Sequence, residues 1–138
     1  MKTCQKKKKI KNMDKIIGII SKGLGEGAYF MSMPHYKSEI KNALGFDAYP
    51  GTLNIKTQID WNKIAIKKRS IKIKGYMDNG KTLGSAECYI AKVKNIEGAI
   101  IVPELTKHKK GVLEFIAPIH VKTKLKVSDG DEIELWLK

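Results

Sequence analysis

The chain has 138 residues, enough for a single domain with a sizeable core. Its 27 Lys and Arg residues against 14 Asp and Glu give a formal net charge of +13, which suits a phosphate-bearing ligand or a nucleic acid. No stretch approaches the roughly 20 apolar residues of a membrane helix. We therefore expect no membrane partner, no secretory signal, and a cytoplasmic protein in which Cys4 and Cys88 stay reduced.

Residues 1–14 are expected to form a basic, disordered tail, and residues 15–138 a folded domain. Six of the first twelve residues are lysines, with no acidic residue among them. Such a run repels itself and orders poorly, and it can act as an arm that binds polyanions. A plain solvated tail is the other interpretation, as is a true start of the protein at Met13.

The first apolar run, Ile16 to Ile20, predicts a strand, and it is followed by the glycine-rich stretch from Gly23 to Phe30. Glycines at alternate positions let the backbone approach a ligand closely, and successive N–H groups of such a loop can bind a phosphate. A plain turn between strands would have the same composition. The stretch is neither a P-loop nor a dinucleotide-binding motif, because the lysine of the first and the βαβ spacing of the second are missing.

A short strand or strand edge is expected over residues 29–33, and then a helix from Pro34 to Leu44 that ends at Gly45. From there the pattern is β, with an Asn-Gly hairpin at residues 78–81, a turn at 95–98 and a short helical turn at 121–127. Further strands are expected at residues 52–56, 70–74, 82–93, 99–102, 112–116 and 133–137, and residues 82–93 could form either one long strand or two with a bulge near Gly84. The predicted fold class is mainly β, a small closed barrel, because closure removes exposed strand edges.

Three side chains in these strands could carry chemistry. Thr52 and Asn54 stand two residues apart and so point to one face of a strand, where their oxygens could bind Mg²⁺ together with phosphate oxygens. Glu114 interrupts an apolar strand, as a half-buried ligand-binding carboxylate or base would. An ordinary outward strand face and an edge glutamate are the open alternatives. The three histidines are widely spaced, and their pattern predicts no zinc site.

Taken together, these segments resemble the archaeal CTP-dependent riboflavin kinase family. The resemblance covers roughly residues 16–137, and its motifs occur in the order of the family. The matching segments are Gly23–Phe30, Pro34 with Tyr36, Leu44–Phe46, Tyr49 with Gly51–Asn54, Gly98–Pro103, Glu114 with Ile116–Pro118, and Asp129–Asp131. The resemblance implies a six-stranded cradle-loop barrel with one or two short helices, related to AbrB-type DNA-binding proteins.

The resemblance also implies transfer of the γ-phosphoryl group of CTP to the 5′-hydroxyl of riboflavin, giving FMN and CDP. It assigns Mg²⁺ as the cofactor, held by Thr52 and Asn54, and the flavin to Thr106 and Glu114, with Glu114 also the candidate catalytic residue. The residues that it assigns to the nucleotide are Gly23, Leu24, Gly25, Glu26, Gly27, Ala28, Tyr29, Ile119, His120, Val121 and Lys122.

Two departures from the family pattern limit what the resemblance implies for this sequence. Ala28 stands where many relatives have a basic residue, so one side-chain contact to phosphate is missing, and the lysine-rich tail has no counterpart in the minimal domain. The competing interpretation is a basic barrel that binds nucleic acid as a regulator. No recognition helix or aromatic RNA-binding signature supports it, so we expect a monomeric enzyme without a nucleic-acid partner.

Overall fold

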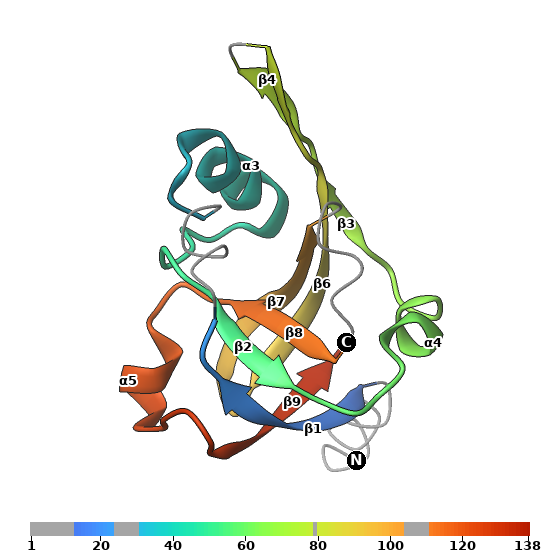
Figure 1. Cartoon of the computed structure of the whole chain (residues 1–138), viewed down its shortest axis with the longest axis vertical. Helices are drawn as coiled ribbons and strands as arrows, with labels where there is room; N and C mark the ends of the chain where they lie inside the picture. Colours follow the sequence, from blue (N-terminus) through green and yellow to red (C-terminus); the bar gives the residue numbers. More distant parts are fainter. Residues whose placement is uncertain (1–12, 24–30, 79, 104–110) are drawn as a thin grey trace, which may run out of the picture.

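The computed structural model describes residues 13–23, 31–78, 80–103 and 111–138, and these residues form a barrel with short helices around it (Figure 1). The strands are β1 (Asp14–Ser21), β2 (Leu53–Lys56), β3 (Ile71–Ile73), β4 (Tyr76–Asp78), β5 (Lys81–Leu83), β6 (Ala86–Val93), β7 (Ile96–Pro103), β8 (Val112–Ile116) and β9 (Glu132–Leu137). The helices are α3 (Pro34–Leu44), α4 (Trp61–Ala65) and α5 (Val121–Leu125). None of the described helices is long and apolar enough to span a bilayer.

Six antiparallel strands close into a ring. Their order is β6-β7-β8-β2-β1-β9, and β9 pairs back onto β6, with Ala91 opposite Leu137. Strand β3 pairs with the first half of β6, next to the part of β6 that pairs with β9. The β4–β5 hairpin extends away from the barrel (Figure 1). The predicted six-stranded closed barrel is therefore confirmed.

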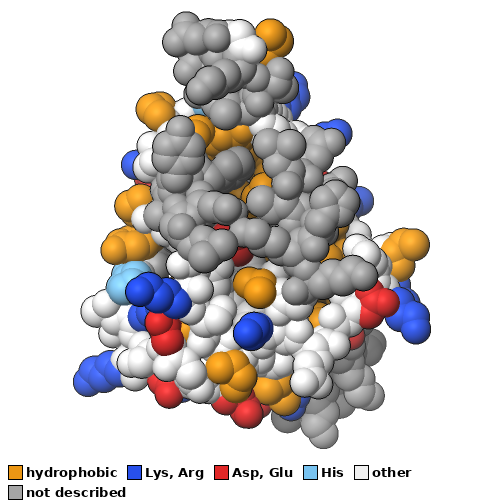
Figure 2. All heavy atoms as spheres, in the orientation of Figure 1, with side chains coloured by type: hydrophobic (Ala, Val, Ile, Leu, Met, Phe, Trp, Pro, Cys, Tyr) orange, Lys and Arg blue, Asp and Glu red, His pale blue; other side chains and the backbone are white. Residues whose placement is uncertain are grey.

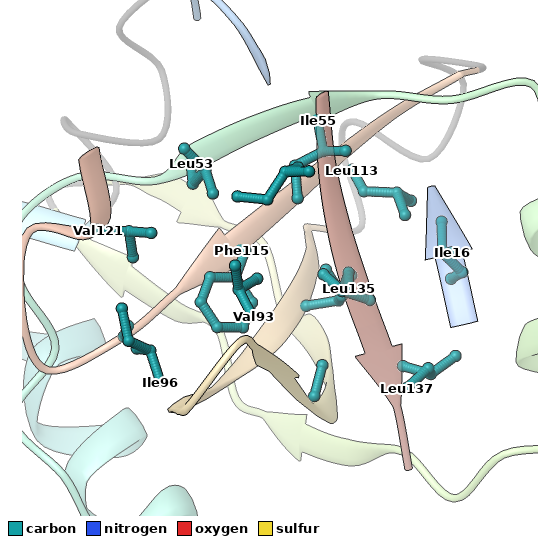
Figure 3. Close-up of a cluster of buried hydrophobic side chains, with 14 of the residues drawn as sticks. Ile16, Leu53, Ile55, Val93, Ile96, Leu113, Phe115, Val121, Leu135 and Leu137 are labelled. Carbon is teal, nitrogen blue, oxygen red and sulfur yellow. The ribbon is translucent and has the colours of Figure 1, made fainter. Parts of the chain in front are cut away.

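Alternation along each strand fills the barrel with apolar side chains. In β2, Leu53 and Ile55 point inward and are buried, whereas Asn54 between them is half-exposed. Figure 3 shows these two side chains meeting Leu113 and Phe115 of β8 around the barrel axis. Because the period of a strand is two, this interior core fixes which side chains of β2 and β8 must lie on the outer face.

A second apolar cluster lies on the outside of the barrel, under α3. Tyr36 and Ile40 of this helix pack on Cys88 and Ile101 of β6 and β7, and all four side chains are buried. The Tyr36 hydroxyl donates a hydrogen bond to the Gly84 carbonyl oxygen at 2.6 Å. The helix begins with Pro34 in its first turn and ends at Gly45, whose φ of 83° is left-handed, so both predicted boundaries hold.

Three local predictions are wrong. Residues 31 and 32 are helical rather than extended, because Met31 is buried in the cluster under α3 and a short apolar run does not distinguish helix from strand. Residues 61–65 form the helix α4, where a β pattern was expected. The side chain of Asp60 accepts a hydrogen bond from the Lys63 amide at the start of this helix. Besides the helical residues 31 and 32, the described residues thus hold three helices, where one or two were expected.

The third error concerns Gly98, which was expected in a turn. The turn lies at residues 94–95, and β7 already begins at Ile96. Gly98 is a strand residue because β8 passes so close that an added Cβ would overlap the carbonyl oxygen of Ile116.

The predicted tail, except for its last two residues, lies outside the described residues. Over the lower, described part of the face in Figure 2, basic and acidic side chains alternate with single apolar ones. The excess positive charge of the chain therefore forms no continuous basic stripe on the described part of that face.

Candidate active site

A row of polar side chains crosses the outer face of three barrel strands. Ser21 of β1 stands opposite Asn54 of β2, and Asn54 stands opposite Glu114 of β8. All three residues are half-buried. The row continues into Ile101 of β7, opposite Glu114, which belongs to the apolar cluster under α3. Glu114 therefore lies at the border between a polar surface and a buried apolar one.

Thr52 and Glu114 are joined directly. The Thr52 hydroxyl donates a hydrogen bond to Glu114 Oε1 at 3.1 Å in a partly buried setting. Thr52 directly precedes β2, Asn54 lies on the outer face of that strand, and the Asn54 amide nitrogen lies 3.5 Å from the Thr52 carbonyl oxygen, a long contact. The residues assigned by resemblance to the metal ion and to the flavin are thus immediate neighbours in space.

The start of the glycine-rich stretch lies against Asn54. A Cβ added at Gly23 would overlap the Asn54 amide nitrogen and would lie 3.0 Å from its Cγ. Gly23 thus leaves room for the Asn54 side chain, and no positive φ is involved. The other predicted loop residues, Leu24, Gly25, Glu26, Gly27, Ala28 and Tyr29, lie outside the described residues, as does Thr106.

The second segment assigned to the nucleotide follows β8 and lies beside the connector that leads into β2. The Tyr49 amide donates to the Ala117 carbonyl oxygen at 2.8 Å, and the rings of Tyr49 and His120 lie 4.9 Å apart. Tyr49 and Ile119 are 40% and 38% exposed. This contact brings residues 117–120 next to the segment that carries Thr52.

The turn after α5 holds the end of β1 and so the start of the glycine-rich stretch. The Gly130 amide donates to the Ile20 carbonyl oxygen at 2.8 Å, and the Ile20 amide donates to the Asp131 carbonyl oxygen at 2.9 Å. Asp129 in the same turn forms an ion pair with Lys122 of α5 at 2.6 Å. The turn thus connects both segments assigned to the nucleotide.

Sequence reasoning missed two members of this region. Ser21 ends the first strand, and continuing the alternation past Ile20 would have placed it on the outer face. Tyr49 was named only as part of a segment that matches the family, because nothing in the local sequence indicates that its ring packs on a distant histidine.

The oxygen donors of Thr52, Asn54 and Glu114 fit a hard cation such as Mg²⁺ when phosphate oxygens complete its shell. Among the described residues no three His, Cys, Asp or Glu side chains group into a metal site of their own. A cation would therefore depend on the charge of its nucleotide.

The resolved pKa shifts lie away from this row of donors. Burial raises the pKa of the Cys88 thiol from 9.0 to about 12, under α3. Burial, followed by the nearby Glu87 carboxylate, raises the pKa of Tyr89, whose hydroxyl donates to that carboxylate at 3.1 Å. Both groups therefore stay neutral near pH 7.

Comparisons with known proteins identify the family of the chain. The family model CTP-dep_RFKase, described as "Domain of unknown function DUF120", matches residues 20–137. A riboflavin kinase of Pyrobaculum calidifontis is 40% identical over 126 residues, covering 88% of this chain and 58% of that protein. A riboflavin kinase of Methanococcoides burtonii is 35% identical over 126 residues, covering 89% of this chain and 56% of that protein.

A riboflavin kinase of Ignicoccus hospitalis is 36% identical over 121 residues, covering 86% of this chain and 68% of that protein. The chain thus spans between about half and two thirds of the length of these curated relatives. The family match covers five of the six barrel strands and the end of β1, and it includes Asn54 and Glu114. On this match, the chain belongs to the CTP-dependent riboflavin kinase family, the family of DUF120.

Proposed function

We propose that this barrel transfers the γ-phosphoryl group of CTP to the 5′-hydroxyl of riboflavin, giving FMN and CDP. The observation that carries the proposal is the 3.1 Å hydrogen bond from Thr52 to Glu114. It brings a residue suited to a cation and its phosphates next to a residue suited to an alcohol. The phosphoryl donor and the acceptor alcohol must lie side by side for phosphoryl transfer, because this reaction depends mainly on positioning and charge neutralisation.

In this proposal the nucleotide lies along the glycine-rich stretch from Gly23 to Tyr29 and along Ile119 to Lys122. The contact between Gly23 and Asn54 supports it, because the loop begins at a side chain that could face the phosphates. Thr52 and Asn54 would hold Mg²⁺, which supplies neutralisation of the phosphate charge when bound. Because residue 28 is alanine and has no basic side chain, a contact to phosphate at this position would have to come from the backbone.

The flavin is assigned to Thr106 and Glu114. Glu114 stands where the polar row meets Ile101 and the apolar cluster, which suits a ligand with a polar chain and an apolar ring system. Its carboxylate orients the 5′-hydroxyl and accepts its proton as the new bond from oxygen to the γ-phosphorus forms. The bond from that phosphorus to the bridging oxygen breaks, and CDP leaves with the electron pair.

Cytoplasmic location and a monomeric state belong to the same proposal. The free, buried thiol of Cys88 is consistent with a reducing compartment. Closure of the barrel supports a monomer, because β9 and β3 together cover the edge of β6 that would otherwise be open for another chain to pair with.

The test incubates the purified chain with riboflavin, MgCl₂ and either CTP or ATP, and FMN is separated by chromatography. We expect FMN with CTP and far less with ATP. Glu114→Gln should lower kcat or flavin affinity at least tenfold, since the amide cannot take the proton. No FMN with any nucleoside triphosphate would refute the proposed function, and a fully active Glu114→Gln protein would refute the role of Glu114.

A further inference from the structure

The Thr52 hydroxyl can face two partners at once. It has one hydrogen, which it donates to Glu114 Oε1 at 3.1 Å, and its oxygen keeps lone pairs for another partner. Both residues are half-buried, so this hydrogen bond is shielded from water in part. A glutamate side chain has three rotatable bonds, and a fixed donor restricts its orientations.

We infer that Thr52 is a positioning residue for Glu114 in addition to its proposed place at the metal ion. The inference rests on the proposed function and deepens it. The hydroxyl of Thr52 orients the carboxylate that receives riboflavin, and it does so before any cation or nucleotide binds. Thr52 therefore affects riboflavin affinity without touching riboflavin.

The local geometry favours Thr52 over its neighbour for this role. Asn54 stands directly opposite Glu114, yet its amide nitrogen points toward the Thr52 carbonyl oxygen at 3.5 Å and packs on Gly23. The Thr52 side chain approaches Glu114 diagonally from the residue before β2. Asn54 thus lies against Gly23, which is assigned to the nucleotide, whereas Thr52 also contacts Glu114, which is assigned to the flavin.

A consequence is coupling between the two substrates. A cation bound at the Thr52 oxygen would fix the hydroxyl in place and so restrict the orientation of the Glu114 carboxylate further. Riboflavin should then bind more tightly when Mg²⁺ and CDP are present, and by reciprocity CDP should bind more tightly when riboflavin is present.

The experiment titrates riboflavin, followed by quenching of its fluorescence, into protein kept in EDTA without nucleotide. We expect Thr52→Val, which keeps the shape of the side chain but has no hydroxyl, to raise the riboflavin Kd about tenfold, within the range for a lost hydrogen bond to a charged group. Thr52→Ser, which keeps the hydroxyl, should stay within about threefold of wild type. A repeat with Mg²⁺ and CDP should show tighter binding in wild type and no such gain in Thr52→Val.

A double-mutant cycle shows whether Thr52 acts through Glu114. In a Glu114→Ala background, Thr52→Val should leave riboflavin affinity unchanged, because the carboxylate that it orients is gone. Thr57→Val is the matched control, since Thr57 follows the other end of β2 and its hydroxyl donates to the Ile17 carbonyl oxygen at 3.2 Å rather than to Glu114. This control should lower thermal stability and leave the riboflavin Kd within about twofold of wild type.

The outcomes separate the inference from the proposed function. Equal riboflavin affinity of wild type and Thr52→Val in EDTA would overturn the inference alone. An equal loss of riboflavin affinity on Thr52→Val in the Glu114→Ala background would also overturn the inference, because Thr52 would then act directly. Riboflavin binding by wild type that occurs only with Mg²⁺ and CDP would overturn it as well. Wild type that binds no riboflavin under any of these conditions would refute the proposed function and the inference together.

Discussion

Gly23→Ala is the substitution that separates the site from the fold most clearly. The added Cβ would overlap the Asn54 amide nitrogen and lie 3.0 Å from Asn54 Cγ, where ordinary contact begins at 3.4 Å. Asn54 Cγ must therefore withdraw by about 0.4 Å, and its amide nitrogen farther. The side chain is half-exposed and can rotate away, at a cost to folding of about 1 kcal/mol for an off-rotamer torsion.

The same movement takes the Asn54 amide out of the position proposed for the cation. Since a misplacement of about 1 Å at a positioned group costs on the order of 100-fold in rate, we expect kcat/KM for CTP to fall roughly 10- to 100-fold. The midpoint of thermal unfolding should fall by only about 3–5 °C.

The assay measures FMN formation over a range of CTP concentrations, with unfolding followed by circular dichroism. Gly51→Ala is the control, because a Cβ there meets only the Tyr49 ring at 3.7 Å, an ordinary contact. We expect it to stay near wild type in both measurements. Full activity of Gly23→Ala would show that its contact with Asn54 does not position the nucleotide.

Three further predictions concern the fold. Gly98→Ala should lower the free energy of unfolding by about 3 kcal/mol or more in urea titrations, because its Cβ would overlap the Ile116 backbone, which cannot rotate away; a loss below 1 kcal/mol would contradict this reason. Tyr36→Phe should lower the free energy of unfolding by about 1 kcal/mol, because the hydrogen bond to the Gly84 carbonyl oxygen at 2.6 Å is lost. Unchanged FMN formation is the check that the site is intact. The buried thiol of Cys88, with its pKa raised to about 12, should resist Ellman's reagent at pH 8 until the protein unfolds. Since the unfolded thiol ionises near pH 9 and the folded one near 12, its contribution to stability is complete below pH 9 and is lost between pH 9 and 12, by up to about 1.4 kcal/mol per pH unit; a Cys88→Ala protein should lack that loss.

The barrel strands were predictable because alternation is a local signal that the packed interior enforces. Leu53 and Ile55 point inward, as expected, and this alone fixes Asn54 on the outer face. The errors occurred where a distant contact overrides local pattern. Met31 is helical under the cluster of α3, and Gly98 lies in a strand because β8 passes over it.

The candidate site was predictable in its members and not in its contacts. Thr52, Asn54 and Glu114 were recognised as polar side chains on strand faces, but the pairing of β2 with β8 is a long-range choice that no short segment specifies. The hydrogen bond from Thr52 to Glu114 and the approach of Gly23 to Asn54 both follow from that pairing and from the pairing of β1 with β2. These two contacts carry the functional account, and only the folded chain shows them.

The most direct test of the central claim uses CTP labelled at its γ-phosphate with radioactive phosphorus. The labelled CTP is incubated with the purified chain, riboflavin and Mg²⁺, and the flavins are then separated. We expect the label to appear in FMN in an amount equal to the CDP formed, and Asn54→Ala to abolish most of this transfer. Label found only in inorganic phosphate, or FMN that carries no label, would contradict this claim.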